Sequence, residues 1–298
     1  MRIPNYSQSE SLVTRLQQLL SKQTALQSQV STGQRITKAS DDPDAMSRVL
    51  QFQADKQQVQ QWSQNGDRAL TVSQATYSGV KSLKSISDRA GEIAVLGVGI
   101  NGADSYNAYV SEVNSLLEQA VQVTDSQLAG NHLFGATKTD ATPFNVTRDP
   151  AGKITGVTYT GAASAAQVRV SDNATITPQT DGATNQKLGD FINNMVALRD
   201  ALQAQSGTAV QAAQPGLHTS ETDLIGTLGD IGATQTRLES VQTMNQSRFT
   251  DLEALTSTDT DADIAQTIVR LTQTQATYEA ALKSGAQLLQ HSLLDYLP

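Results

Sequence analysis

The chain has 298 residues, of which 38% are hydrophobic and only 4% aromatic, and its formal net charge is −8. A nucleic-acid-binding surface needs concentrated lysine and arginine, so this acidic balance argues against a nucleic-acid partner. Cysteine is absent, which excludes disulfides, thiolate nucleophiles and Cys-ligated zinc, and the low aromatic content favours long helices over a compact enzyme pocket.

The first predicted element is a helix over about residues 9–30. Apolar residues recur there at alternating steps of four and three, which is the pattern of a coiled-coil seam with one glutamine at a core position. The N-terminus before it has no apolar run typical of a cleaved secretion signal. The seam consists of Leu12, Leu16, Leu19, Gln23, Leu26 and Val30.

A short connector follows this helix. Gly33 is predicted to end the first helix, and Asp42 followed by Pro43 supplies an N-cap and a proline at the first position of a second helix. Asp44 then lies in the first turn, where the helix dipole favours a negative charge.

The next segments are predicted to be helical as well. Apolar spacing indicates a long helix through residues 59–94, another that starts at a capping Asp104, and a seam with polar interruptions over 224–252. A shorter helix carries Phe191, Met195, Leu198 and Leu202 on one side.

The segment 136–185 differs from the rest in being rich in Thr, Gly, Ala and Asp. Residues 144–148 and 153–160 can pair as a hairpin around Asp149-Pro150-Ala151-Gly152, which suits a type I turn. The run 167–170 is predicted to add a third strand. We therefore predict a mainly α protein, an elongated helical bundle or coiled coil formed by the N- and C-terminal segments, with a small β-rich insertion.

The C-terminal segment has a second seam with the same rhythm, which passes through Gln275 and Gly285. Such seams pack either on each other within one chain or on other chains, and we favour other chains because chain ends are poorly ordered unless a contact holds them. The apolar members of this seam and of the tail after it are Ile264, Ile268, Leu271, Tyr278, Leu282, Leu289, Leu293 and Leu294.

Patterns that could indicate chemistry do not hold together. Asp259, Asp261 and Asp263 begin like a calcium loop, but Ile264 and Arg270 stand where an EF-hand needs Gly and Glu. The three histidines are far apart, and no phosphate-binding loop, nucleophile elbow or zinc-protease motif occurs. We predict no enzyme, no cofactor and no metal.

Three stretches resemble one family. "STGQRITKASDDPDAM" (31–46) resembles the first signature of the flagellin superfamily, and Pro43 makes it similar to the hook-associated protein 3 branch. "GNHLFGATKTDATPF" (130–144) and "SLLDYL" (292–297) resemble two further patterns of that branch, although Ala136 replaces an expected glycine.

This resemblance implies a structural protein outside the bacterial cell, at the junction between the hook and the filament of the flagellum. The implied partners are hook-associated protein 1, flagellin, copies of the same chain and, transiently, the filament cap. Type III export would be preceded by binding to a cytoplasmic export chaperone, and neither nucleic acid nor membrane insertion is implied. A flagellin-type filament subunit or a free-standing coiled-coil binding module are the alternatives.

The predicted organisation has three parts. Residues 1–44 and 258–298 form terminal coiled-coil segments, 45–135 and 186–257 form a helical core, and 136–185 form the insertion. The terminal seams are predicted to be the assembly interface, and we expect them to order only on assembly. The predicted connector comprises Gly33, Arg35, Ile36, Asp41, Asp42 and Pro43.

Overall fold

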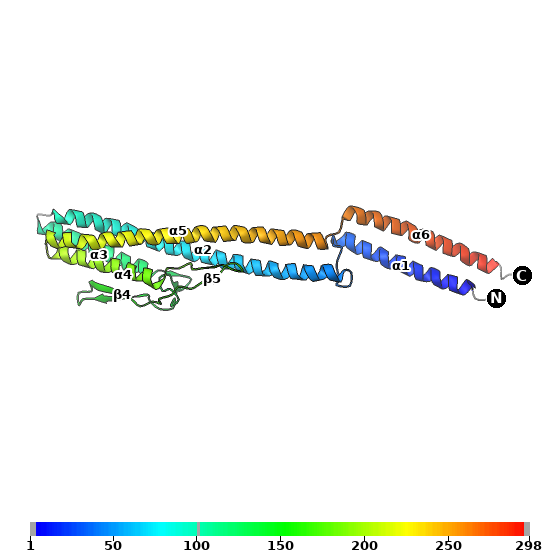
Figure 1. Cartoon of the computed structure of the whole chain (residues 1–298), viewed down its shortest axis with the longest axis horizontal. Coiled ribbons are helices and arrows are strands. Elements are labelled where there is room, and N and C mark those ends of the chain that lie inside the picture. The colour runs from blue at the N-terminus through cyan, green and yellow to red at the C-terminus, as the bar shows by residue number, and fades with distance from the viewer. Residues whose placement is uncertain (1–3, 100–101, 295–298) are drawn as a thin grey trace. The chain divides into compact units, whose positions relative to one another are not determined.

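The computed structural model describes residues 4–99 and 102–294 (Figure 1). The helices of this part of the chain are α1 (Pro4–Thr32), α2 (Pro43–Val98), α3 (Ala103–Thr124), α4 (Gly182–Gln203), α5 (Gly207–Thr260) and α6 (Ile264–Leu294). The strands form three two-stranded sheets: β1 (Gln127–Leu128) with β2 (Asn131–His132), β3 (Phe144–Arg148) with β4 (Ile154–Tyr159), and β5 (Val168–Arg169) with β6 (Thr175–Ile176). The prediction of a mainly α fold with a small β-rich part is confirmed.

Contacts divide the chain into two units. We call Met1–Gln57 with Phe249–Pro298 the terminal unit, and Gln58–Arg248 the central unit. The division falls inside α2 and α5, so each of these helices contributes residues to both units. The three-part division predicted from the sequence has different boundaries and stays a prediction.

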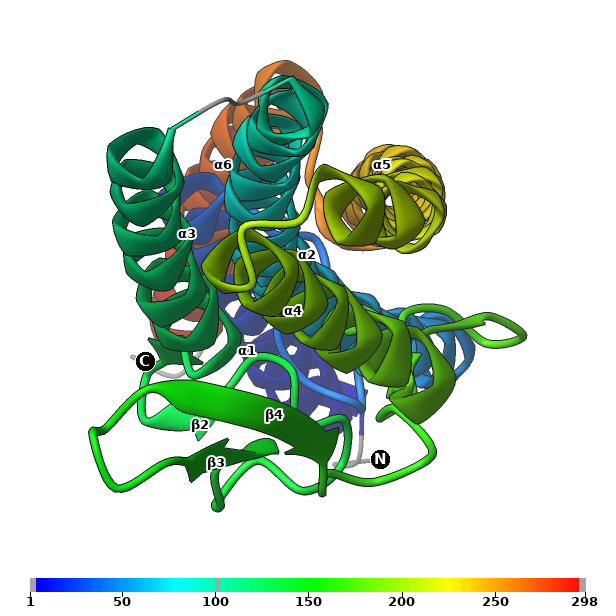
Figure 2. The ribbon, with the colours of Figure 1, turned by 90° about the vertical axis from the view of Figure 1, so that its left-hand side faces the viewer.

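The core of the central unit lies where α3 and α4 pack against each other and β4 lies against both (Figure 2). Residues of α2 and α5 complete this core. The predicted short helix is confirmed as α4, and its four apolar residues are all buried. Among the largest fully buried side chains are Leu83, Ile93, Leu117, Phe134, Phe191, Ile192 and Leu224.

The predicted hairpin is confirmed as β3 and β4. They pair antiparallel, with Phe144 opposite Tyr159 and Val146 opposite Val157, and a bulge follows Thr147. Phe144 and Tyr159 meet edge to face with ring centroids 5.4 Å apart. Because Phe144, Ile154 and Val157 are buried in the core of the central unit, the hairpin is part of that core.

The predicted third strand does not join this hairpin. β5 pairs with β6 instead, and these strands share a small buried cluster with Ala69 of α2 and Leu238 of α5. The side-chain amides of Asn65 and Asn245 donate to the carbonyls of Arg169 and Val170 at 3.0 Å each. These bonds hold the segment against α2 and α5, away from the ladder that the sequence predicted.

One predicted helix cap is also wrong. α3 begins after Gly102, whose extended backbone occupies the N-cap position without a side-chain bond. Asp104 is the second residue of the helix and lies in its first turn. In contrast, the Asp181 carboxylate caps α4 by accepting from the Thr184 amide at 2.8 Å.

Candidate assembly interface

The connector between α1 and α2 is built as its sequence predicts. Gly33 ends α1 with φ +73°, a left-handed conformation that favours glycine, and its amide donates to the Gln29 carbonyl at 2.9 Å. Pro43 is the first residue of α2. Asp42 caps that helix through its Oδ1, which accepts from the Ala45 amide at 3.1 Å.

Asp41 holds the middle of the connector in a tight turn. Its Oδ2 accepts from the amides of Lys38 and Thr37 at 2.9 and 3.1 Å. These backbone bonds, that of Lys38 first, lower the pKa of Asp41 below its ordinary value. Ile36 is buried, with 4% of its surface exposed, so the connector also places an apolar side chain out of contact with water.

The connector is also bonded to the turn between α5 and α6, an arrangement that the sequence did not predict. The Arg35 amide donates to the Thr260 carbonyl at 2.6 Å, and the Ala262 amide donates to the Gly33 carbonyl at 2.9 Å. Gln34 and Asp261 lie opposite each other as an isolated antiparallel bridge. The two connectors of the terminal unit therefore pair like two short strands.

Two arginines reinforce this pairing. Arg35 donates to the carboxylate of Asp42 at 3.2 Å and to the carbonyl of Asp259 at 2.9 Å. Arg48 binds the carboxylate of Asp259 with two hydrogen bonds, which is the strongest geometry for such a pair. The pKa of Asp259 is lowered mainly by this bond, and the pKa of Asp42 mainly by the Ala45 amide, then by Arg35.

α1 and α6 pack against each other within the terminal unit. Leu26 is buried, while Leu12, Leu16, Leu19, Gln23 and Val30 are half-buried. A Cβ on Gly285 of α6 would lie 2.6 Å from the Leu12 side chain, so the helices are in close contact there. The α1 seam thus faces α6 of the same chain, whereas the sequence favoured a contact with other chains.

The predicted α6 seam is divided between two faces. Leu271 and Tyr278 are half-buried and Gly285 is buried, in register with Thr267 and Thr274, which are each only 7% exposed. Three other predicted residues that the structure describes lie on the neighbouring flank and are exposed: Ile264 by 39%, and Ile268 and Leu282 by 44% each. The seam that contacts α1 is therefore narrower and more polar than predicted.

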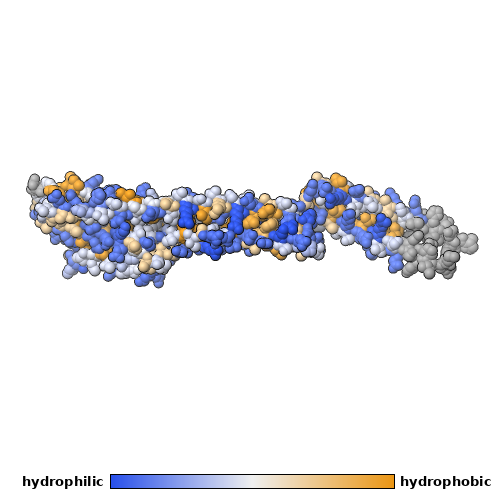
Figure 3. Space-filling model, in the orientation of Figure 1, coloured by the Kyte–Doolittle hydropathy of each residue, from blue (hydrophilic) through white to orange (hydrophobic). Residues whose placement is uncertain are grey.

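Further large apolar side chains are exposed on the same helix pair. Val13 and Leu20, seven residues apart on one flank of α1, are 52% and 50% exposed, and Val269 of α6 is 63% exposed. Figure 3 shows apolar residues on the surface over α6. We call Val13, Leu20, Ile264, Ile268 and Leu282 the outer apolar set.

The side chains of Leu289, Leu293 and Leu294 lie outside the described residues. In the part that the structure describes, no cluster of three or more His, Asp or Glu side chains could hold a metal ion. Asp263, part of the calcium-like run, instead accepts from the Gln266 amide at 3.0 Å near the start of α6. None of the described helices combines the length and apolar character that a membrane span requires.

Comparison with known proteins extends these observations. The chain is 23% identical over 295 residues to flagellar hook-associated protein 3 of Salmonella typhimurium, an alignment covering 89% of this chain and 90% of that protein. Residues 3–139 match the bacterial flagellin N-terminal helical region. The resemblance to hook-associated protein 3 and the flagellin superfamily is confirmed.

Solved structures share the hook-associated protein fold. The Bacillus cereus FlgL structure superimposes with a TM-score of 0.60 at 17% identity and covers 70% of this chain and 99% of that one. The flagellar junction protein FlgL from Legionella pneumophila gives 0.52 at 11% identity, over 72% of this chain and 100% of that one. The comparisons together support a structural role in the bacterial flagellum.

Proposed function

We propose that this chain is a subunit of the hook–filament junction of the bacterial flagellum and that it assembles through α1 and α6. Its neighbours would be hook-associated protein 1 on the hook side, flagellin on the filament side and copies of itself. The filament cap would contact it transiently during growth. The chain would act outside the cell as a structural protein without enzymatic activity.

The outer apolar set carries this proposal. Isolated exposed apolar residues are ordinary, but these five lie on the flanks of one helix pair and are 39–52% exposed. Full burial of an exposed side chain of this kind contributes about 1.5–3 kcal/mol, so covering the exposed half of each contributes roughly half of that before the cost of ordering is subtracted. An interface with neighbouring subunits would bury them.

The seam between α1 and α6 is weak enough to depend on such an interface. It contains Gln23, Thr267 and Thr274 beside its apolar residues. Among the leucines of α1 whose burial the structure describes, only Leu26 is buried. A single helix of this length is marginally stable in water. We therefore infer that the pair gains most of its stability when neighbours cover its outer side.

The paired connectors would orient the two terminal helices relative to the first turns of α2 and the last turns of α5. Arg35, Asp42, Arg48 and Asp259 hold this joint by side chains that are 18–53% exposed. Subunits that dock through one patch onto a different patch of the neighbour build a helix or tube unless the contacts close into a ring. A junction subunit needs a defined joint, because every copy would hold its terminal helices at the same angle to α2 and α5.

The C-terminal leucines would serve a second partner before assembly. Leu282 is exposed, and Leu289, Leu293 and Leu294 continue the apolar pattern along the sequence. An export chaperone that covers this segment in the cytoplasm would prevent premature association. After type III export the same leucines would enter the interface with neighbouring subunits.

Two alternatives differ in their behaviour in solution. A flagellin-type subunit would polymerise alone into long filaments, and a free-standing coiled-coil module would form closed oligomers. The junction subunit should sediment mainly as a monomer and assemble only on hooks that carry hook-associated protein 1. Deletion of the gene should give hooks without filaments, and normal filaments on the deletion strain would refute the proposal.

A further inference from the structure

The two outer edges of the β3–β4 hairpin differ. On the β4 side, the amide group of Asn193 from α4 accepts from the Val157 N–H at 2.8 Å and donates to the Val157 carbonyl at 2.9 Å. One side chain thus satisfies both backbone groups that an edge strand would otherwise expose. Natural sheets cover such edges because an open edge can pair with another chain.

The β3 side has no such cover. The Thr160 amide donates to the Pro143 carbonyl at 2.8 Å, so the alternation of an antiparallel ladder places its remaining bonds at Asn145 and Thr147. The N–H and C=O groups of Phe144 and Val146 therefore point away from β4. Within the described part of the chain no hydrogen bond satisfies them.

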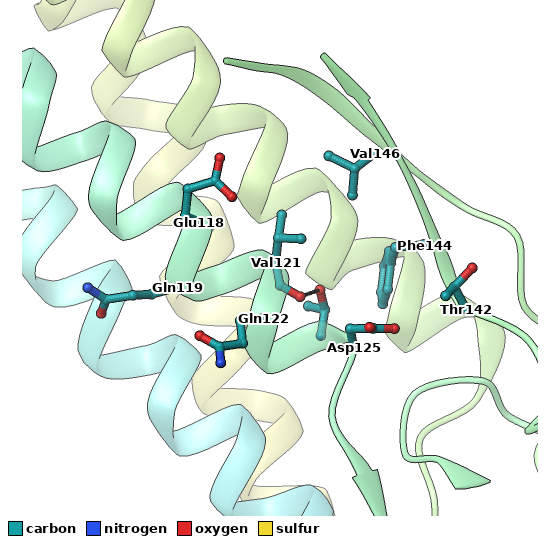
Figure 4. Close-up of a pocket in the computed structure, with 9 residues that line it drawn as sticks. Glu118, Gln119, Val121, Gln122, Asp125, Thr142, Phe144 and Val146 are labelled. Atoms are coloured by element: carbon teal, nitrogen blue, oxygen red, sulfur yellow. Dashed lines mark hydrogen bonds between the residues drawn. The ribbon is translucent and has the colours of Figure 1, made fainter. Parts of the chain in front are cut away.

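A groove of about 530 Å³ runs between this strand and α3 (Figure 4). Its apolar lining comes from Val121 of α3 and from Phe144 and Val146 of β3, whose side chains point toward α3 in the figure. The amide side chains of Gln119 and Gln122 lie along the helical wall. An apolar groove beside an open strand edge is the geometry by which proteins bind an extended segment as an added strand.

The charge of the groove restricts its occupant. Two carboxylates line it, Glu118 and Asp125, and no lysine or arginine is among the lining residues. Arg148 already binds Glu118 with a hydrogen bond of 2.8 Å. The side chain of Asp125 is 53% exposed, and its Oδ1 lies 3.2 Å from the Nδ1 of His132, so its carboxylate can meet a basic group at this end.

We propose that the β3 edge and the α3 groove bind an extended segment of a partner protein, which adds as a third strand and carries alternate apolar side chains and one basic side chain. The apolar side chains would cover Val121, Phe144 and Val146, and the basic side chain would meet Asp125. Since α3 forms the opposite wall, the groove suits a single chain better than the two-stranded hairpin of a second copy. This site belongs to the central unit and does not depend on the terminal helices.

The test uses the full-length protein and a capped, fluorescently labelled seven-residue peptide of alternating valine and threonine with one threonine replaced by lysine. We expect saturable binding by fluorescence anisotropy. Methylating the valine backbone nitrogens should weaken binding by about tenfold or more, because the strand loses its hydrogen bonds. Replacing the lysine with glutamate should weaken it as well.

Protein variants locate the binding. Val146→Pro removes an N–H that does not bond β4, and Gln122→Trp fills the groove from α3 without substituting a residue of the strand, so both should abolish binding. Asn145→Ala is the matched control, because that side chain is exposed on the other face of β3, and it should bind as the parent does. If Val146→Pro unfolds the hairpin by circular dichroism, Gln122→Trp decides.

Three results would overturn the inference. They are the absence of saturable binding, equal binding of the methylated peptide, and unchanged binding by the Gln122→Trp variant. Sedimentation provides a fourth: a dimer of the protein alone that Val146→Pro abolishes would assign the edge to a second copy.

Discussion

Arg48 and Asp259 lie 211 residues apart in the sequence, yet their side chains meet through two hydrogen bonds, Nη2 to Oδ1 at 2.6 Å and Nε to Oδ2 at 3.1 Å. The pair joins the first turns of α2 to the last turn of α5. It lies beside the backbone bond from Arg35 to Thr260. The pair therefore closes the joint between the two connectors.

Replacing Asp259 with Asn should loosen this joint without unfolding the protein. The carboxylate charge that binds Arg48 and attracts Arg35 would be lost, so the Arg35 amide should exchange with solvent several-fold faster. Hydrogen exchange read by mass spectrometry over residues 33–42 measures this. Glu253→Gln, which changes an exposed carboxylate of α5 that pairs with Lys56, is the control, and equal exchange in both variants would contradict the prediction.

The joint should resist mild acid. The pKa values of Asp41, Asp42 and Asp259 all lie below the ordinary 3.8, so the folded state binds fewer protons than the unfolded state. Their contribution to stability is fully present above pH 3.8 and is lost as the pH falls through the folded pKa values. Carboxyl titration by NMR checks this, and a midpoint at or above 3.8 for Asp42 would refute it.

Two leucine substitutions should separate the inner seam from the outer apolar set. Leu26→Asp places a charge in the contact between α1 and α6 and should destabilise the terminal unit by about 3 kcal/mol. Leu282→Asp should change stability by less than about 0.5 kcal/mol, because the side chain is already exposed, yet it should prevent filament retention on cells. A melting temperature lowered equally by both would refute the division into two faces.

Ala136→Gly should stabilise the central unit. Ala136 is buried and has φ +56°, a left-handed conformation that costs a residue with a Cβ about 1–2 kcal/mol. Glycine removes that cost but adds freedom to the unfolded chain, so we expect a net gain of about 0.5 kcal/mol. Gly152→Ala is the inverse control at φ +82°, and thermal unfolding should show shifts of opposite sign.

Asn193→Ala should destabilise the hairpin. Two backbone groups of Val157 would lose their partners at a half-buried site, at a cost of about 1–3 kcal/mol. Asn193→Gln retains the amide but moves it by one methylene, and it should recover little. Urea unfolding of the three proteins measures the difference, and a loss below about 0.5 kcal/mol would show that water replaces the amide.

The face of α6 that contacts α1 could not be predicted from apolar spacing. The apolar spacing favoured Ile268 over Thr267, yet Thr267 and Thr274 are the residues that face α1. Their hydroxyls donate to the carbonyls of Asp263 and Arg270 at 2.7 Å each, which satisfies the polar group inside the helix and leaves a methyl group to pack. A hydropathy pattern does not register this local bond.

The connector likewise has some features that the sequence predicts and others that it does not. Gly33, Asp42 and Pro43 act on their immediate neighbours, so turn and capping rules were sufficient to place the end of α1 and the start of α2. The bonds from Arg35 and Arg48 to Asp259 cross more than 200 residues. No local rule connects residues at that separation. The bonds between the Asn193 amide and Val157 of β4 are also between residues distant in sequence, so local rules do not predict them either.

The pairing of the two connectors has a mechanical consequence. The chain passes between the terminal helix pair and the longer helices twice, once at residues 33–42 and once at 261–263, and the bonds between Gly33 and Ala262 and between Arg35 and Thr260 tie these passages together. A torque that twists α1 about its axis would therefore strain both passages at once. Rotation in the flagellum would therefore twist the two passages together, and their resistance to twisting would depend on two backbone hydrogen bonds and the arginines beside them.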